Sequence, residues 1–342
     1  MQPLEFPFSL LCLSALFPFT CTAIGYAVDD HPAPGHGACS YPGSGQIRSY
    51  TFNVSKASYA PDGVQKPGLL VNGRFPGPAL DANCGDTLQI TVHNNLDEGT
   101  SFHWHGLFQH GTQWYDGVPG VDLCPIAPGA SFTYRFLADQ PGTTWWHAHY
   151  DAQLADGLFG PIRINGSRYG IKYDVELPIV TLGSHYHKTY QELVKNTEST
   201  PPDIPLIDNN LINGKSYYNC STVITGQSCS PNQSLSTLDF TTNKAHLLRL
   251  VNVGAEGTQH FAIDGHKMTV VANDFVPVQP YQVDSVTLAT GQRTDIIVQG
   301  LANAAGAYFA RSNISGVCDP VDRKSTRLNS SHSGESRMPS SA

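Results

Sequence analysis

Short runs of alternating apolar and polar residues recur along most of the chain, separated by Gly, Pro, Asn and Asp. Successive side chains of a β-strand point to opposite faces, so this alternation is typical of strands that bury one face. The clearest runs are 87–93 (TLQITVH), 131–136 (SFTYRF) and 293–298 (RTDIIV), whereas only residues 187–194 read as a helix. The pattern predicts an all-β protein built of sandwiches.

The two halves of the chain share landmarks in the same order. The paired landmarks are Val71-Asn72-Gly73 with Ile212-Asn213-Gly214, Val92-His93-Asn94 with Leu250-Val251-Asn252, Gly106 with Gly265, Gly129 with Gly291, and Gly142 with Gly306. The offset between partners grows along the chain, as loop insertions would make it. Chance similarity among β sequences is the alternative, but the conserved order favours a duplicated sandwich. We therefore predict two tandem domains, at residues 45–165 and 166–319.

Both ends of the chain differ in composition from the rest. Residues 1–27 resemble a secretory signal peptide, with an apolar run at 9–17 that is too short to span a membrane. Cleavage is expected after Ala23 or Ala27, and Pro7 and Pro18 disfavour the alternative of a buried N-terminal element. We expect a secreted, extracellular protein. Residues 323–342 have few apolar side chains and are expected to be a non-native or disordered tail without a strand.

In a secreted protein we expect the cysteines to form disulfides, because thiols pair in an oxidising compartment. Of eight cysteines, Cys12 and Cys21 lie in the expected signal peptide, which leaves six, at positions 39, 84, 124, 220, 229 and 318. Six cysteines allow fifteen pairings, among which Cys220 with Cys229 is the simplest local choice. Asn-x-Ser sequons, which fit a glycosylated extracellular protein, begin at Asn53, Asn165, Asn219, Asn232 and Asn313.

The charge balance bears on the class of partner. Lys and Arg total 20 against 28 for Asp and Glu, so the formal net charge is −8, and no basic run is present. A nucleic-acid surface needs clustered basic residues, so we expect no nucleic-acid partner. We also expect no membrane span.

Two His-x-His pairs supply the candidate chemistry. His103 and His105 form one pair and His147 and His149 the other, each in a predicted strand. Residues two apart in a strand share a face, so each pair presents two imidazoles to one side. A single pair is commonly part of an ordinary half-buried strand, but two matching pairs in one domain predict a metal site. Imidazole suits copper, zinc, iron and nickel, so the donors alone do not name the metal.

The sequence around these histidines resembles the first domain of the multicopper oxidases, and is most similar to that of fungal laccases. The resemblance is carried by residues 103–106 (HWHG), 116–118 (DGV), 124–126 (CPI), 146–150 (WHAHY) and 155–160 (ADGLFG). The second half resembles the family's second domain through residues 250–252 (LVN), 263–266 (IDGH) and 291–295 (GQRTD). Together the matches cover residues 45–317 and imply a cupredoxin-like Greek-key sandwich in each half.

The resemblance also implies copper as cofactor and a role for each matched residue. The complete enzymes hold four coppers, three of them in a cluster bound by histidines of the first and third domains. His103 would be a type 2 copper ligand, and His105, His147 and His149 would be type 3 copper ligands. Asp116 would be a catalytic residue that assists proton delivery to reduced oxygen. The alternative for Asp116 is plain turn chemistry, because Asp-Gly is a frequent turn dipeptide.

The remaining histidines are expected to have no part in this site. His185 and His187 repeat the spacing but lie away from the matched ligands, which favours a surface or structural role. His246, His260 and His266 occupy landmarks where the first half has no ligand or a different one. We expect these three in the core or between the domains.

No cysteine in this sequence stands between histidines. Enzymes of the family accept electrons at a type 1 copper, which two histidines and a cysteine hold, in a third domain with a His-Cys-His motif. The resemblance therefore covers the first two domains of a three-domain enzyme. We expect the chain to be inactive alone and the complete protein to be a monomer.

Three functions remain open from the sequence. The leading hypothesis is a laccase-like enzyme that oxidises small phenolic substrates by one electron and reduces O2 to water. A ferroxidase is the second, although Ser184 stands where the acidic residue of that type is expected. The third is a non-catalytic copper-binding cupredoxin module.

Overall fold

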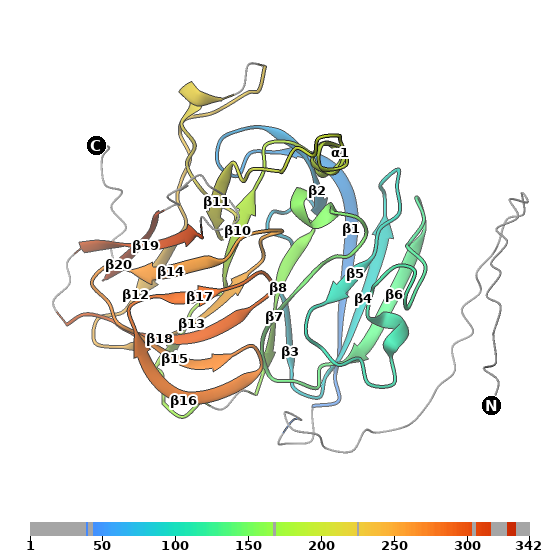
Figure 1. Cartoon of the computed structure of the whole chain (residues 1–342). Helices are drawn as coiled ribbons and strands as arrows, with labels where there is room; N and C mark the ends of the chain where they lie inside the picture. The colour runs from blue at the N-terminus through green and yellow to red at the C-terminus, as the bar shows by residue number, and fades with distance from the viewer. Residues whose placement is uncertain are drawn as a thin grey trace, which may run out of the picture. The chain divides into compact units, whose positions relative to one another are not determined.

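The computed structural model describes residues 39, 44–166, 169–223, 226–302, 306–315 and 327–332 (Figure 1). These residues belong to one compact unit, Ala33–Ala342. The expected signal peptide, residues 1–27, lies outside the described residues.

The first eight strands form two four-stranded sheets. One sheet has the strand order β2-β1-β4-β6 and the other the order β3-β8-β7-β5. The strands are β1 Ile47–Tyr59, β2 Lys66–Val71, β3 Leu80–Asn83, β4 Thr87–Asn94, β5 Phe102–Trp104, β6 Ser131–Leu137, β7 Gly142–Ala148 and β8 Phe159–Asn165. Two short 3₁₀-helices, η1 Gln113–Tyr115 and η2 Gln153–Asp156, lie in the connections.

The later strands form the other two sheets. One has the order β11-β10-β13-β18-β15-β16 with β9 beside β13, and the other the order β12-β20-β19-β14-β17. The strands are β9 Val175–Glu176, β10 Val180–His185, β11 Asn209–Ile212, β12 Thr237–Phe240, β13 Ala245–Asn252, β14 Gln259–Ile263, β15 Met268–Asn273, β16 Val276–Val283, β17 Val286–Leu288, β18 Arg293–Gln299, β19 Gly306–Ile314 and β20 Arg327–His332. The helices are α1 Tyr190–Thr197 and η3 Cys220–Thr222.

The prediction of an all-β fold is confirmed, and the three clearest alternating runs coincide with β4, β6 and β18. In β4 the apolar residues Leu88, Ile90 and Val92 are fully buried while their neighbours are partly exposed. Strand β18 differs from this pattern, because all its residues up to Val298 are buried. Its second face is covered by β7 of the first half, so polar residues there are buried too.

Each pair of sheets encloses its own apolar core. The first core joins Phe52 and Ile90 from one sheet to Trp104 and Trp146 from the other. The second core, which includes Phe261, joins the remaining two sheets in the same way. Strands of the two halves share no sheet among the described residues. The domain limits 45–165 and 166–319 stay a prediction.

Helix α1 begins three residues later than the sequence indicated. Thr189 is its N-cap: the Thr189 side chain accepts from the Glu192 N–H, and the Glu192 side chain accepts from the Thr189 N–H. This reciprocal capping box satisfies donors that the first turn leaves open, so the helix starts at Tyr190.

The expectation that residues 323–342 contain no strand is wrong for Arg327–His332. These residues form β20, which pairs with β12 and β19. A strand ladder is made by main-chain hydrogen bonds, which do not depend on apolar side chains. Composition alone therefore missed this strand.

Two disulfides tie the described residues. Cys220 is bonded to Cys229, as the sequence predicted, and Cys39 is bonded to Cys84. Cys124 is exposed and forms no disulfide with a described cysteine. Cys318 lies outside the described residues.

Candidate metal centre

The ladder between β5 and β7 sets the positions of the histidines. The two strands are antiparallel, with His103 directly opposite His147 and Trp104 directly opposite Trp146. His105 directly follows β5, in a turn, and His149 directly follows β7. Directly opposed residues of an antiparallel pair lie on the same face, so the register brings the two predicted pairs together.

The two faces of this sheet have different partners. Trp104 and Trp146 point into the first core, where both are fully buried. The histidine face carries Trp145, which packs against Val251 and Val253 of the second half. The histidines therefore lie where the first half meets the second.

Strand β5 is held in place by a buried tyrosine of β6. The Phe102 N–H donates to the Tyr134 hydroxyl at 3.0 Å, and both residues are fully buried. Because Phe102 directly precedes His103, this bond fixes the start of the segment that carries the first pair.

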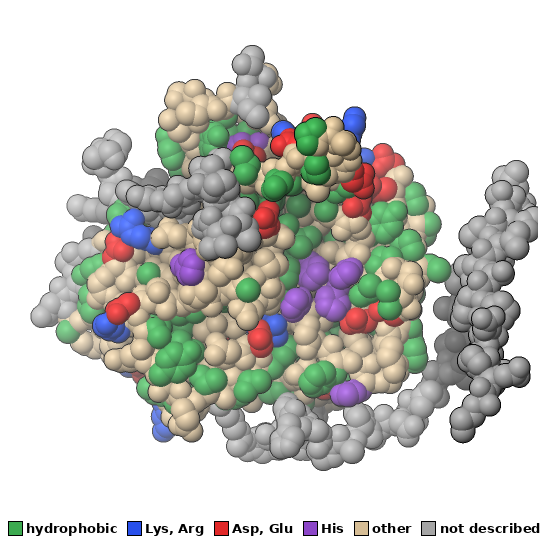
Figure 2. Space-filling model, in the orientation of Figure 1, with side chains coloured by type: hydrophobic (Ala, Val, Ile, Leu, Met, Phe, Trp, Pro, Cys, Tyr) green, Lys and Arg blue, Asp and Glu red, His purple; other side chains and the backbone are tan. Residues whose placement is uncertain are grey.

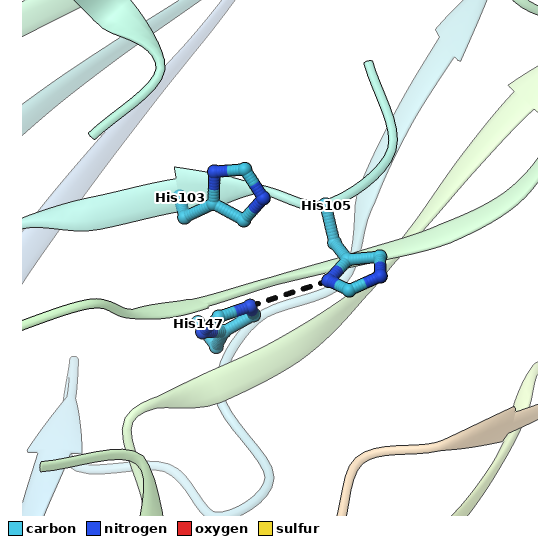
Figure 3. A group of neighbouring side chains, drawn as sticks. All are labelled: His103, His105 and His147. Atoms are coloured by element: carbon cyan, nitrogen blue, oxygen red, sulfur yellow. Dashed lines mark hydrogen bonds between the residues drawn. The ribbon is translucent and has the colours of Figure 1, made fainter. Parts of the chain in front are cut away.

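Three imidazoles come close enough to share a metal ion. One ring nitrogen from each of His103, His105 and His147 lies within 4.8 Å of the others. Figure 3 shows these rings turned toward one another, with His105 Nδ1 at 3.4 Å from His147 Nε2. The ring of His149 is exposed and its centre lies 5.6 Å from that of His103. Histidine side chains gather near the middle of the face drawn in Figure 2.

Backbone carbonyls orient two of these rings. His103 Nδ1 donates to the carbonyl of Asp116 at 2.8 Å, and His147 Nδ1 donates to the carbonyl of Ala148 at 3.0 Å. In each ring the proton is thereby placed on Nδ1, which leaves the Nε2 lone pair available to a metal.

The surroundings keep two rings neutral. Burial, with the nearby Arg293 charge and neighbouring imidazoles, lowers the pKa of His105 to about 3. Burial is also the main reason that the pKa of His147 falls to about 3. Metals bind the unprotonated imidazole, so these donors are ready at neutral pH. A compact set of neutral nitrogen donors fits copper.

Asp116 lies beside the histidine group. Its backbone carbonyl holds His103, and its Oδ1 lies 3.3 Å from His103 Nδ1. Asp116 also ends the short helix η1, so it has the turn role that the Asp-Gly dipeptide indicated. The turn therefore brings a carboxylate next to a candidate ligand.

Two second-half residues at this site were not foreseen from the sequence. Gly291 has φ +81° and lies so close to His105 that a Cβ there would be 2.7 Å from the ring Cε1. Arg293 Nε donates to the carbonyl of Thr143 on β7 at 2.9 Å. The repeat, which matched Gly291 with Gly129, and the resemblance of residues 291–295 to the family's second domain were the only signals, and neither assigned a role to these residues.

The other histidines divide into three groups. His246 and His266 are buried, as expected, whereas His260 is only partly buried and contacts Thr287 Oγ1 at 2.9 Å. A surface position for His185 and His187 is wrong, because both are buried. They lie beside a buried carboxylate and away from the histidine group of β5 and β7.

Comparison with known proteins agrees with this geometry. Two family models, each described as multicopper oxidase, match residues 53–168 and 176–333. Laccase-2 of Botryotinia fuckeliana is 43% identical over 278 residues, which is 81% of this chain and 47% of that protein. The chain thus spans about half the length of the curated relatives that it matches.

Solved structures show the same relationship. The laccase from Botrytis aclada superposes with a TM-score of 0.78 at 37% identity, covering 88% of this chain and 56% of that chain. A multicopper oxidase that functions in iron import superposes with a TM-score of 0.75 at 27% identity, covering 87% of this chain and 54% of that one. Both halves therefore have the cupredoxin-like sandwich fold, and the chain belongs to the multicopper oxidase family, in its fungal laccase-like group.

Proposed function

We propose that the chain is part of a laccase-type enzyme that oxidises small phenols by one-electron steps and reduces O2 to water. In this proposal His103 is a type 2 copper ligand, and His105, His147 and His149 are type 3 copper ligands. Copper, the cofactor of the family, accepts and passes on single electrons when it is bound.

The observation that carries the proposal is the register of β5 and β7. It sets two His-x-His pairs opposite each other on one sheet face, with nitrogens of three rings within 4.8 Å. A structural histidine needs one hydrogen-bond partner, whereas here several imidazoles converge and backbone carbonyls occupy the far nitrogens of two of them. Such an arrangement favours ligation of metal over a purely structural role.

Three residues beside the histidines have definite tasks in this proposal. The carbonyls of Asp116 and Ala148 fix the orientation of His103 and His147. The Trp145 ring, whose centre is 4.3 Å from that of His147, limits the space around the ligands. The Asp116 carboxylate, beside His103, would relay protons toward the site, as the resemblance implies.

Phenols are the proposed donors, ahead of Fe(II). Ser184, at the position where an acidic residue would favour Fe(II), accepts the Glu256 N–H at 3.4 Å through its hydroxyl. A neutral hydroxyl offers Fe(II) a weaker ligand than a carboxylate. The relative that functions in iron import keeps ferroxidase activity as the second candidate.

We also propose that the protein is secreted and glycosylated. The two disulfides fit an oxidising compartment, and the sequon residues Asn53, Asn219, Asn232 and Asn313 are exposed. No helix among the described residues is long and apolar enough to cross a membrane.

Oxygen uptake by the copper-loaded protein tests the function. We expect residues 1–342 alone to bind copper without oxidising a diphenol, because they contain no His-Cys-His segment. A form that also carries such a segment should consume O2 faster with the diphenol than with Fe(II). Faster uptake with Fe(II) would replace the laccase by the ferroxidase, and absence of bound copper would overturn both.

A further inference from the structure

A second group of possible metal ligands lies away from the histidines of β5 and β7. It consists of Asp62, in the turn between β1 and β2, and of His185 and His187, at and just after the end of β10. The three side chains are buried, with residue exposures of 0%, 2% and 4%. One ligand comes from the first half and two from the second, so the group joins the halves.

The three residues face one another through their donor atoms. His187 Nε2 lies 2.9 Å from Asp62 Oδ2, and His185 Nε2 lies 4.0 Å from Asp62 Oδ1. One ligand atom from each residue lies within 4.8 Å of the other two. A cation bound about 2.0–2.2 Å from each of three ligands fits this spacing after small side-chain shifts.

One nitrogen of the group has no hydrogen-bond partner within the part of the chain that the structure describes. His185 Nε2 is buried and makes no hydrogen bond there. A buried polar atom without a partner is unfavourable, because it has given up its hydrogen bonds to water. The Asp62–His187 bond accounts for two members of the group as an ordinary buried pair, but it leaves His185 unexplained.

Neighbouring groups hold the ligands in the way metal sites require. Asn209 Nδ2 donates to Asp62 Oδ2 at 3.0 Å, and the Val64 N–H donates to Asp62 Oδ1 at 3.1 Å. On the far side of its ring, His187 Nδ1 lies 3.9 Å from Asp208 Oδ1. This separation is too long for a hydrogen bond, but Asp208 Oδ2 accepts the His187 main-chain N–H at 2.8 Å and keeps the carboxylate beside the ring.

The positive charge near the group is already paired with a carboxylate, so it does not oppose the binding of a cation. Lys66 is the nearby ammonium, and its Nζ is paired with Asp156 at 2.7 Å and bonded to the Lys188 carbonyl at 2.8 Å. A cavity of about 470 Å³, lined in part by Lys66, His187 and Gln227, reaches the group from one side. This cavity gives a cation a route as far as His187.

We propose that Asp62, His185 and His187 form a second metal site, which binds a zinc ion and clamps the two halves together. Two imidazoles, one carboxylate and a water make a tetrahedral donor set that zinc favours. The ion supplies the partner that His185 Nε2 needs. It links the β1–β2 turn to the end of β10, so binding should stabilise the contact between the halves.

Zinc binding can be measured without interference from the first group. In a His105→Gln/His147→Gln background, two ligands of the β5 and β7 group are removed, and competition with a chromophoric chelator should reveal one zinc equivalent. Adding His185→Asn should weaken zinc binding by at least about 100-fold, because replacing residues that merely orient ligands costs about 10–100-fold. Adding His260→Asn, a partly buried histidine outside both groups, is the matched control and should change nothing.

In the chelator assay, two results would overturn the site. One is a background protein that binds no zinc, and the other is unchanged zinc affinity after His185→Asn. Since a substituted chain can misfold, anomalous diffraction at the zinc edge from the unsubstituted protein, soaked in zinc alone, gives an independent result. We expect a peak between the three side chains, and a peak only at the β5 and β7 histidines would reject the proposal.

Discussion

Gly291 supports the His105 ring from the second half, and replacing it with alanine should disturb the metal centre. The residue has φ +81°, and an added Cβ would lie 2.7 Å from His105 Cε1 and 2.9 Å from Nε2. Ordinary contacts of this kind begin at 3.4 Å, so the ring must move by about 0.7 Å. His105 Nδ1 lies 3.4 Å from His147 Nε2, so this movement changes the spacing between two candidate ligands.

Two costs follow from the substitution, and they can be separated. The left-handed backbone conformation costs a non-glycine residue about 1–2 kcal/mol, which should appear in the free energy of unfolding in urea. The displaced ring should weaken copper binding by about 10–100-fold, because metal sites tolerate ligand shifts of only about 0.2 Å. Copper affinity is measured by competition with a chelator, on protein whose circular dichroism matches the parent.

Gly129→Ala is the matched control. Gly129 has φ +73°, but an added Cβ there meets nothing within 4 Å. The control should therefore lose a similar amount of stability while keeping its copper affinity. If both variants bind copper equally well, Gly291 does not position His105 and the reasoning fails.

Three further predictions concern buried polar contacts. Tyr134→Phe removes the acceptor of the Phe102 N–H, so the free energy of unfolding should fall by about 1–3 kcal/mol in urea titrations, with faster amide exchange at Phe102. Lys66→Met leaves the buried Asp156 carboxylate without its cation, so the free energy of unfolding should fall by about 3–5 kcal/mol. Adding Asp156→Asn should recover part of this loss. If the losses of the two substitutions simply add, the two side chains are not paired. Burial raises the pKa of Glu176, but the guanidinium groups of Arg249 and Arg163 lower it by a larger amount. The pKa of Glu176 is therefore below the ordinary 4.5. The stability it contributes is thus present above about pH 4.5 and lost as the pH falls, so unfolding free energies of Glu176→Gln should depend less on pH in the acid range, and equal slopes would refute this.

The sequence was sufficient for features that depend on neighbouring residues. Alternation in 87–93 identified β4, because a strand with one face in a core must alternate. The same rule put His103 and His105 on one face. The second pair, His147 and His149, could be assigned to the same site only through the repeated His-x-His spacing and the resemblance. No pattern of neighbouring residues indicates that His103 lies opposite His147.

Contacts between the halves were beyond such reasoning, and they decide much of the chemistry. The low pKa of His105 has burial as its first cause and the Arg293 charge as its second. Arg293 and Gly291 reach the site only because β18 lies against β7, a contact between segments far apart in the chain. His185 shows the same limit: its spacing from His187 was visible, but the carboxylate of Asp62 comes from the other half. Periodicity therefore located the candidate ligands, whereas their protonation, their support and the second candidate group follow from how the two sandwiches meet.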